Sequence, residues 1–401
     1  MATLSVLNKL RHLSCLKQAT EKILPTFSSI SSRQMSTAES AEYHLLPYKF
    51  HNLDIELPYS ATLTRDEGLH YYREMVTIRR FEQEASKLYK EKVIRGFCHL
   101  YSGQEACAVG MTATLTPDDS VITAYRAHGW TYLKGRSVKQ VLAELTGRKG
   151  GCTQGKGGSM HMYAHEFYGG NGIVGAQVPL GAGVAFAHKY RGNGRVCVTL
   201  YGDGAANQGQ IFETFNMAAL WDLPCIFVVE NNGYGMGTSS NRASAVDEFY
   251  TRGDFIPGIS VDGNCVISVR EASKYAVDHA KNKGPILLEL NTYRYFGHSM
   301  SDPGTSYRTR DEIQETRQKR DPINGFKERL VGLELATQAE LKKVDQEVKK
   351  MVDEAVQFAR TDAEPPRDDM AMFIYSEGTG GESVRGSDLF TQFPTNDRLK
   401  F

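Results

Sequence analysis

The 401-residue chain lacks several features that would point to particular classes of protein. Neither sign of charge dominates, because Lys plus Arg and Asp plus Glu each total 47, so nothing favours a nucleic-acid partner or an acidic surface. No apolar run approaches the length of a membrane-spanning helix, which argues against membrane insertion. The seven cysteines form no C-x-x-C pair, which predicts reduced, mostly buried thiols in a protein that is not secreted. No internal repeat is present, which argues against a repeat architecture. At 401 residues the chain is long enough for one large α/β domain or two smaller ones.

The most informative part of the chain is a strand–helix–strand unit in its middle. Hydrophobic patterning predicts a buried parallel strand, a crossover helix and a second strand at residues 195–201, 211–220 and 224–229. Gly202-Asp203-Gly204 follows the first strand, and Asn231-Asn232 follows the second, with 26 residues between them. Both turns therefore lie at the carboxyl ends of adjacent parallel strands, which is where ligands of open α/β sheets bind.

The oxygen atoms at these turns suit a magnesium-bound diphosphate. Asp203 offers a carboxylate oxygen, Asn232 an amide oxygen, and Tyr234 a main-chain carbonyl that the flanking glycines leave free to turn inward. Gly204 and Ala205 let backbone N–H groups approach a diphosphate at a helix N-terminus. Either turn alone would be read as an ordinary turn. The spacing of the two, with a strand and a helix between them, favours a Mg²⁺ site formed by Asp203, Asn232 and Tyr234.

The first 35 residues differ in composition from the rest of the chain. They hold five basic residues and one acidic residue, many serines, and leucines at helical spacing. This profile predicts a mitochondrial transit peptide over residues 1–35 and a mature protein in the mitochondrial matrix. The alternative is a disordered arm without a targeting role.

The remaining elements predict one α/β domain over residues 61–362 between an N-terminal arm and a C-terminal tail at residues 36–60 and 363–401. Capping boxes predict three helices, which start at Thr64, Ser102 and Thr337 and continue to about residues 92, 115 and 358. Short buried strands are expected at residues 121–124 and 286–291, and a polar loop at 297–310.

Glycine is concentrated in one segment, because residues 147–183 hold 12 of the 38 glycines. A flexible linker is one interpretation of this composition. Large apolar side chains interrupt the glycines, which linkers rarely allow, so an ordered loop system close to a ligand or another subunit is favoured.

Gly-Asp-Gly followed about 26 residues later by Asn-Asn resembles the cofactor motif of thiamine-diphosphate enzymes. The surrounding sequence, from about residue 50 to about residue 375, resembles the alpha subunits of mitochondrial pyruvate dehydrogenases, which are thiamine-diphosphate-dependent 2-oxo acid dehydrogenases. The most specific segments are residues 95–105, 123–129, 157–162, 170–175 and 293–304. The resemblance implies a thiamine-diphosphate-binding α/β fold, with a mostly parallel sheet flanked by helices. It also implies oxidative decarboxylation of pyruvate with acetyl transfer to the lipoyl group of the acyltransferase.

The resemblance assigns further residues to the cofactor site. It implies that Arg126 binds the diphosphate with Tyr125 beside it, since a guanidinium forms forked hydrogen bonds to phosphate oxygens. His99 and His298 match positions near the reacting end of the cofactor and are the candidate catalytic residues. A structural salt bridge for the arginine and simple packing for each histidine are the alternatives. Backbone positions that match cofactor-lining positions of the family are Gly172, Val174 and, more weakly, Ala164.

One absence concerns the activating glutamate that thiamine-diphosphate catalysis requires. The chain has one diphosphate-type module, and residues 206–401 show too few strand signals for a second sheet, so the glutamate is expected in trans. The resemblance agrees, because it implies an α2β2 heterotetramer with a beta subunit that supplies the glutamate. It also implies docking of the lipoyl domain of dihydrolipoyl acetyltransferase.

The resemblance implies regulation by a kinase and a phosphatase acting on Ser299, Ser306 and Ser239. The alternative is that these serines have no regulatory role, since serines are common in solvated loops. Two departures from the commoner family pattern bear on the assignment. Phe296 stands where a histidine is usual, which concerns the packing of the loop, and residues 240–242 replace an acidic stretch, which concerns kinase recognition of Ser239.

Two other functions compete with pyruvate dehydrogenase. The alpha subunit of a branched-chain 2-oxo acid dehydrogenase is the nearest, although residues 298–304 look like the pyruvate type. A non-catalytic scaffold that kept the fold is the other, and the presence of Asp203, Asn232 and Arg126 argues against it.

Overall fold

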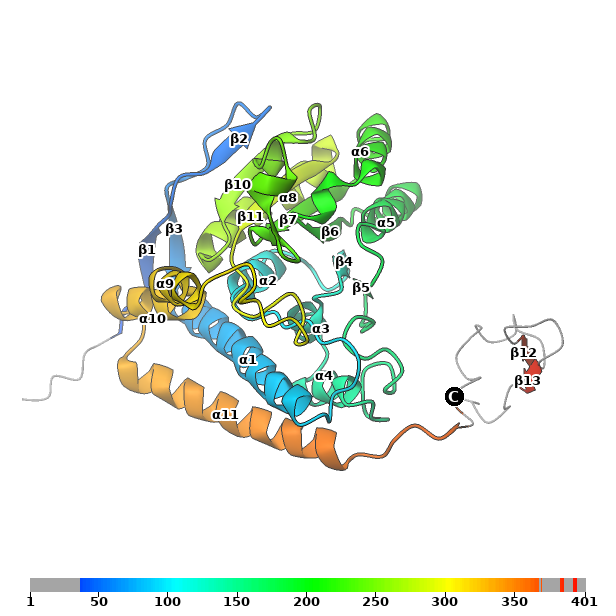
Figure 1. Cartoon of the computed structure of the whole chain (residues 1–401). Coiled ribbons are helices and arrows are strands. Elements are labelled where there is room, and N and C mark those ends of the chain that lie inside the picture. Colours follow the sequence, from blue (N-terminus) through cyan, green and yellow to red (C-terminus); the bar gives the residue numbers. More distant parts are fainter. Residues whose placement is uncertain (1–36, 368, 370–382, 386–391, 395–401) are drawn as a thin grey trace, which may run out of the picture. The chain divides into compact units, whose positions relative to one another are not determined.

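The computed structural model describes residues 37–367, 369, 383–385 and 392–394. Within them the central element is a seven-stranded sheet in which every neighbouring pair is parallel except β2 with β10 (Figure 1). The strand order is β2 (Lys49–His51), β10 (Gly258–Asp262), β11 (Ile286–Asn291), β7 (Cys225–Asn231), β6 (Cys197–Gly202), β4 (Ser120–Ala124) and β5 (Phe167–Asn171). The predicted α/β class with a mostly parallel sheet is confirmed, and the strand–helix–strand unit forms its centre.

The central strands are mostly apolar because both faces of the sheet are covered. Alternate residues enter two separate cores: Val198 and Ile226 pack into the larger one, while Tyr201 and Phe227 pack into the smaller one. A strand buried on both sides therefore needs continuous hydrophobic sequence, which is the pattern that identified β6, β7 and β11.

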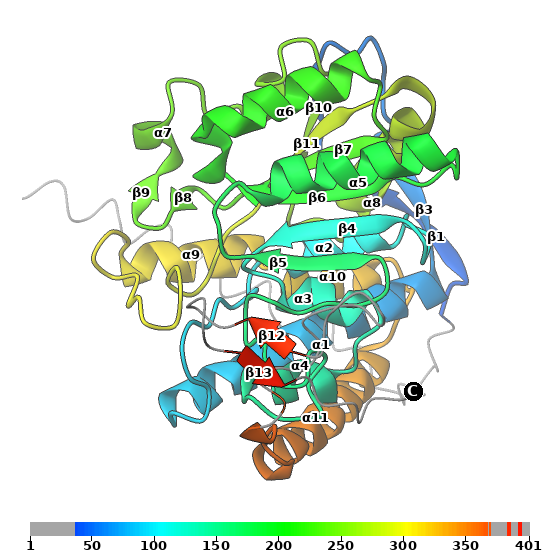
Figure 2. The same cartoon turned by 90° about the vertical axis from the view of Figure 1, so that its right-hand side faces the viewer.

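Helices cover both faces of the sheet, in one layer on one face and in two layers on the other. α5 (Gln177–Arg191) and α6 (Gly209–Leu220) lie side by side over one face (Figure 2). α8 (Val266–Lys283) and α2 (Glu105–Thr112) cover the other face, and α1 (Arg65–Lys90) and α11 (Gln338–Thr361) pack outside them. The other helices are α3 (His128–Leu133), α4 (Val138–Leu145), α7 (Ser240–Ala243), α9 (Arg310–Arg320) and α10 (Pro322–Gly332). No helix among the described residues is long and apolar enough to cross a membrane.

Two of the three predicted capping boxes are present, and the third is wrong. Thr64 and Thr337 each accept a hydrogen bond from the N3 backbone N–H and complete the reciprocal pair with a glutamate. Ser102 does not cap α2, which begins three residues later, after Gln104. The Glu105 carboxylate accepts hydrogen bonds from the Arg79 guanidinium instead, so a buried ion pair takes the glutamate that the capping box would have used.

The N-terminal arm is extended, as its prolines suggest. β1 (Ser40–His44) pairs with β3 (Ser60–Thr64), and β2 adds an antiparallel edge strand to the sheet. In the C-terminal tail, β12 (Ser383–Arg385) pairs with β13 (Gln392–Pro394). The transit peptide predicted over residues 1–35 lies outside the described residues.

The glycine-rich segment is a defined structure and contains β5, which the sequence patterning missed. Residues 146–166, which we call the glycine-rich loop, connect α4 to β5. The Glu144 carboxylate on α4 accepts hydrogen bonds from four backbone N–H groups of this loop at 2.7–3.1 Å, those of Thr153, Gly155, Gly157 and Gly158. The prediction of an ordered loop is therefore confirmed over that of a flexible linker.

The thiols agree with the sequence prediction over the described residues. The six cysteines there are all free, and Cys98, Cys107, Cys197 and Cys225 are buried. Burial raises the pKa of Cys98, Cys197 and Cys225 above the ordinary range, so these thiols stay protonated and serve as small packing residues.

Candidate functional site

The two polar turns meet at the carboxyl edge of β6 and β7. The first turn leads into a single 3-10 turn, Ala205–Asn207, and α6 starts only at Gly209, so the helix N-terminus expected at Gly204 lies further along the chain. The second turn leads into β8 (Tyr234–Gly235), which pairs with β9 (Thr238–Ser239). Gly204 and Gly235 pack backbone to backbone, since a Cβ added at Gly204 would lie 3.0 Å from the Cα of Gly235. The absence of side chains there brings the turns together.

A cavity of about 230 Å³ lies between these turns, and buried oxygens line it. Asp203 is 2% exposed and Asn232 is 8% exposed, and neither the Asp203 Oδ2 nor the Asn232 Oδ1 has a hydrogen-bond partner. Burial raises the pKa of Asp203 to about 6 against the effect of nearby backbone N–H groups. Unpaired buried oxygens are costly unless something binds them. A hard cation would satisfy both atoms, so the predicted magnesium ligands fit such an ion.

The third proposed magnesium ligand, the Tyr234 carbonyl, has a protein partner. Arg294 donates from Nη1 to this carbonyl at 3.3 Å and from Nη2 to the Met236 carbonyl at 3.0 Å. A carbonyl oxygen has two lone pairs, so this bond leaves capacity for a metal. Arg294 also places a positive charge beside the cavity, which it lines together with Arg126.

Arg126 is buried at the same edge, and its guanidinium is held by main chain. It donates to the Leu100 carbonyl at 2.6 Å and to the His298 carbonyl at 2.9 Å. Burial, with the neighbouring Arg294 charge, lowers the pKa of Arg126 to about 10, which still leaves it cationic at neutral pH. Arg126 therefore places a positive charge at the cavity and links the segments that hold Leu100 and His298.

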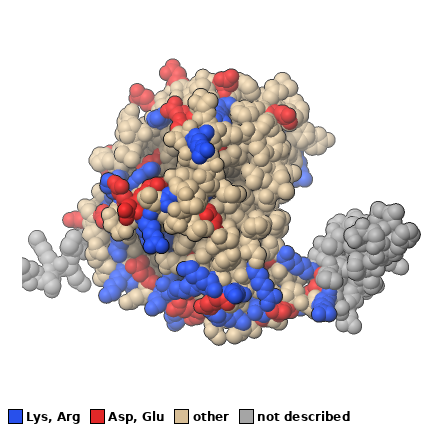
Figure 3. All heavy atoms as spheres, viewed as in Figure 1, with Lys and Arg blue, Asp and Glu red and all other residues tan. Residues whose placement is uncertain are grey.

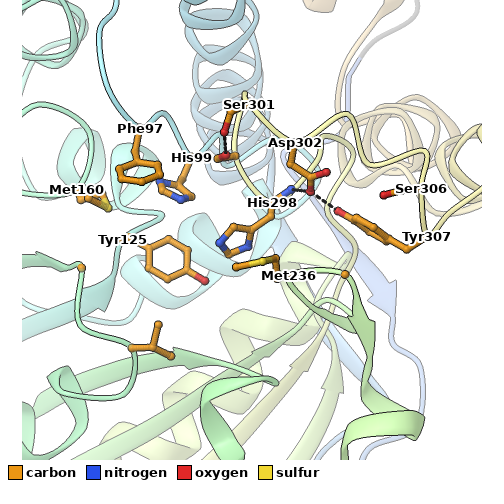
Figure 4. Close-up of a pocket in the computed structure, with 14 residues that line it drawn as sticks. Phe97, His99, Tyr125, Met160, Met236, His298, Ser301, Asp302, Ser306 and Tyr307 are labelled. Carbon is orange, nitrogen blue, oxygen red and sulfur yellow. Dashed lines mark hydrogen bonds between the residues drawn. The ribbon is translucent and has the colours of Figure 1, made fainter.

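A second cavity of about 640 Å³ adjoins the first, and the two share Tyr125, Val174, Met236 and His298. Three rings meet where the cavities join (Figure 4): the His99 and Tyr125 centroids are 4.5 Å apart, and His298 lies 5.3 Å from each. The structure thus brings together three predicted site residues from distant segments of the chain. On the face of the molecule that Figure 3 shows, charged side chains gather over α11 and α9, and most of the remaining visible surface is uncharged.

Both histidines are neutral in this environment. Burial, followed by the Arg126 charge, lowers the pKa of His99 to about 2 and that of His298 to about 4. The Nδ1 atoms of both rings have no hydrogen-bond partner. Neutral imidazoles with a free ring nitrogen can accept or donate one hydrogen bond to a small substrate.

The loop after β11 forms one wall of the second cavity, and we call residues 297–309 the serine loop. Its Asp302 carboxylate accepts hydrogen bonds from the His298 N–H at 2.7 Å, the Gly304 N–H at 2.8 Å and the Tyr307 hydroxyl at 2.6 Å (Figure 4). Arg308 donates to the Arg294 and Phe296 carbonyls at 2.6 and 2.7 Å. Phe296 therefore contributes its carbonyl to the base of the loop, whichever side chain it carries.

The three candidate phosphorylation serines have different surroundings. Ser299 is 6% exposed and its hydroxyl lies 2.7 Å from that of Ser301. Ser306 is exposed at the cavity rim. Ser239 ends β9, away from both cavities, and its hydroxyl donates to the Asn241 side chain at 2.7 Å.

Most of the sequence-predicted cofactor residues line one of the two cavities. Ala164 lines neither, because it packs against the larger core and bridges to Phe167. Sequence reasoning gave no role to several lining or adjacent residues: Gln104, Met160, Glu230, Met236, Arg294 and Tyr307. Gln104, Met160 and Arg294 stand within the specific segments of the resemblance, so a signal existed for them, whereas Glu230 stands outside those segments and meets Gln104 only in the fold.

The chain matches the dehydrogenase E1 component family over residues 73–367. It is 59% identical to the pyruvate dehydrogenase E1 component subunit alpha, somatic form, mitochondrial, of Homo sapiens over 357 residues, which cover 89% of this chain and 91% of the relative. The same identity and coverage hold for the Bos taurus protein of that name. A probable pyruvate dehydrogenase E1 component subunit alpha, mitochondrial, of Caenorhabditis elegans is 59% identical over 366 residues, 91% of this chain and 92% of the relative.

Proposed function

Because the chain belongs to the dehydrogenase E1 component family, we propose that it is the mitochondrial alpha subunit of the decarboxylating component of pyruvate dehydrogenase. Pyruvate is oxidatively decarboxylated with thiamine diphosphate, and the acetyl unit passes to the lipoyl group of dihydrolipoyl acetyltransferase. The observation that carries the proposal is the pair of unpartnered oxygens on Asp203 and Asn232 beside the cluster of three rings. The chain then acts in the mitochondrial matrix, with residues 1–35 as its transit peptide.

Asp203, Asn232 and the Tyr234 carbonyl would hold Mg²⁺, and the ion would bind the diphosphate. The donor set has one carboxylate and two neutral oxygens, which suits a cation that completes its shell with phosphate oxygens and water. Arg126 and Arg294, which line the same cavity, would offset the remaining negative charge of the diphosphate. Backbone at Gly204 and Ala205 approaches the same space.

His99, Tyr125 and His298 would face the reacting end of the site. Thiamine diphosphate, when bound, supplies the electron sink for decarboxylation. The two neutral imidazoles can orient the pyruvate carboxylate and keto oxygen by hydrogen bonds and hold a proton at the free Nδ1 atoms. Phe97, Met160 and Met236 surround the rings with apolar surface that excludes water.

A beta subunit would complete the active site in an α2β2 heterotetramer by supplying the activating glutamate. All strands of the parallel sheet belong to one diphosphate-type module within the described residues, which leaves the second module to a partner. The outer face of α5 and α6 exposes large apolar side chains that fit a subunit interface: Leu180, Phe186, Tyr190, Phe212, Leu220 and Trp221. The isolated chain is therefore expected to be inactive and prone to aggregate, and an active, monodisperse monomer would contradict the in-trans glutamate.

A kinase and a phosphatase would regulate the enzyme at Ser299, Ser306 and Ser239. Phosphorylation adds about −1.5 to −2 charges and three acceptor oxygens. Ser299 lies next to His298 and three residues from Asp302, so a phosphate there would repel Asp302 and the anionic substrate. Since Ser299 is buried, modification also requires the serine loop to open.

Substrate preference tests the function directly. Co-expression with the matching beta subunit, followed by steady-state decarboxylation rates with pyruvate and 2-oxoisovalerate, is expected to show faster turnover of pyruvate. Faster turnover of 2-oxoisovalerate would identify a branched-chain 2-oxo acid dehydrogenase. No turnover of either substrate, with no thermal shift on adding Mg²⁺ and thiamine diphosphate, would identify a scaffold.

Asp203→Ala tests the metal site without relying on turnover. The substitution removes the only carboxylate among the proposed ligands, and two neutral oxygens hold Mg²⁺ poorly, so binding of Mg²⁺ with thiamine diphosphate should be lost while the assembly stays folded. Calorimetric titration of the purified heterotetramer measures it. Wild-type binding by the variant would refute the metal assignment.

A further inference from the structure

A chain of buried hydrogen bonds leads from Trp130 to Asn232, and one of its members, Glu230, also lines the cavity. The Trp130 indole N–H donates to the Tyr101 hydroxyl at 3.1 Å, and that hydroxyl donates to the Glu230 carboxylate. The Gln104 amide donates from Nε2 to the other Glu230 oxygen at 3.4 Å, and its Oε1 accepts from the Asn232 Nδ2 at 3.1 Å. The chain thus joins α3, the segment before α2, and β7 to one of the two unpartnered oxygens of the cavity.

We propose that Gln104 and Glu230 are positioning residues that fix which atom of the Asn232 amide faces the cation site. This inference rests on the magnesium–diphosphate site proposed above. It adds a role for two residues that act through the Asn232 amide, although one of them, Glu230, also lines the cavity.

The direction of the hydrogen bonds follows from the contacts of the Gln104 amide. Its Nε2 lies 3.4 Å from a Glu230 oxygen, and its Oε1 lies 3.1 Å from the Asn232 Nδ2. The Gln104 oxygen then points at Asn232, which must answer with its own NH₂ group. An asparagine amide has one oxygen, and with its nitrogen committed to Gln104 that oxygen is left facing the cavity, where it has no partner among the described residues.

Because its partners are buried, the orientation of the Asn232 amide has a large effect on the cation site. Gln104 is 1% exposed and Glu230 is 9% exposed, so water cannot replace a lost partner easily. If the Asn232 amide turned by half a rotation, its NH₂ group would point at a divalent cation, and the three proposed ligand oxygens would fall to two. Partners behind a metal ligand change metal affinity about 10–100-fold in other metal sites.

The competing explanation is that the chain of hydrogen bonds serves stability alone. It then predicts that removing the Gln104 amide destabilises the fold and leaves the affinity for Mg²⁺ unchanged. The two explanations differ in the metal affinity of the folded assembly, which can be measured without turnover.

The test compares Gln104→Met with Gln140→Met in the α2β2 heterotetramer, by calorimetric titration of Mg²⁺ at saturating thiamine diphosphate. Gln104→Met keeps the length of the side chain and removes both amide groups, and we expect the Kd for Mg²⁺ to rise about tenfold. Gln140→Met is the matched control, because Gln140 belongs to the capping box of α4 and its loss should lower the thermal midpoint without changing the Kd. Glu230→Gln, which is isosteric, provides a second variant in case Gln104→Met does not assemble, and it should weaken Mg²⁺ binding less than Gln104→Met.

The outcomes separate this inference from the proposed site. If Asp203→Ala loses Mg²⁺ binding while Gln104→Met and Glu230→Gln keep the wild-type Kd, the positioning role is wrong and the metal site stands. If Asp203→Ala itself binds Mg²⁺ as wild type does, the proposed metal site is wrong. A raised Kd in Gln104→Met with a wild-type Kd in Gln140→Met supports the positioning role.

Discussion

The glycine-rich loop and the serine loop are both irregular segments beside the cofactor cavities, and each is organised around one carboxylate. Glu144 is fully buried and accepts four backbone N–H groups. Asp302 is partly exposed and accepts two backbone N–H groups and the Tyr307 hydroxyl. In both loops a carboxylate accepts backbone N–H groups, but the carboxylate is fully buried in one case and partly exposed in the other.

The difference lies in where each carboxylate is anchored. Glu144 belongs to α4, so its hydrogen bonds attach the glycine-rich loop to a helix of the domain body. Asp302 belongs to the serine loop itself and bonds to residues at most five positions away, so it shapes the loop without attaching it. We infer that the glycine-rich loop is a permanent wall, while the serine loop can be released by a local change.

Removing the Glu144 carboxylate should have the largest effect on stability. Glu144→Gln replaces one acceptor oxygen with an NH₂ group that faces backbone donors, so the free energy of unfolding should fall by about 3 kcal/mol or more. Chemical unfolding of the heterotetramer measures it, with Glu340→Gln as a control that loses a capping box and the ion pair with Arg65, worth about 1 kcal/mol together. If both variants lost the same free energy of unfolding, the buried Glu144 carboxylate would contribute no more to stability than the partly exposed Glu340.

Ser299→Glu should abolish most activity, by about tenfold or more, while leaving the free energy of unfolding nearly unchanged. The added charge lies beside His298 and near Asp302 in the serine loop. Ser306→Glu should lose less, because Ser306 is exposed at the rim and farther along the loop from His298. Ser299→Ala should keep most activity and resist inactivation by the kinase at this site. Near-wild-type rates in both glutamate variants of the reconstituted heterotetramer would mean that this loop is not the switch.

Asp302→Asn should loosen the serine loop without unfolding the domain. The neutral side chain keeps one acceptor and loses charge-assisted hydrogen bonds worth about 1.4 kcal/mol, which corresponds to a tenfold larger open population. Trypsin should then cut after Arg308, which is buried in the closed loop, about tenfold faster. Thermal midpoints should match wild type. An unchanged cleavage rate would show that contacts other than those of Asp302, such as the bond from Arg126 to the His298 carbonyl, hold the loop closed.

The smallest effect is expected from mild acid. Burial raises the pKa of Asp302, but hydrogen bonds from Tyr307 and the backbone lower it more, so the net pKa lies below its ordinary value. A carboxylate with a lowered pKa stabilises the folded loop above the unfolded pKa, and this stability is lost only as the pH falls through the folded pKa. Hydrogen exchange of the serine loop, corrected for intrinsic rates, should therefore be the same at pH 7 and pH 5. Reduced protection at pH 5 would indicate that another group holds the loop.

The sequence predicted the centre of the fold better than its edges. β6, α6 and β7 were found because strands covered on both faces need unbroken apolar sequence. β5 was missed because it contains Gly169 and Gly170, which have low strand propensity, and it forms only because β4 pairs with it. Ser102 was wrongly assigned as a cap because the Arg79–Glu105 ion pair, between residues 26 positions apart, has no local signal.

In the candidate site, too, the residues with a local sequence signal were found, and those placed only by tertiary contacts were not. Asp203, Asn232 and Tyr234 stand in turns whose spacing carries a signal, so sequence reasoning found them. Gln104 and Glu230 are 126 residues apart in the chain, and their roles exist only where the fold brings them together. Residues that bind a ligand can be read from a motif, but residues that orient them depend on tertiary contacts.

The edge strand β2 also has a consequence for how the chain folds. Its partner β10 lies about 200 residues further along, so the sheet edge is closed only by a contact between distant parts of the sequence. Contacts of such long range form slowly, and until then β10 exposes unpaired N–H and C=O groups that can pair with another chain. The three residues of β2 therefore act as a cover against aggregation during folding.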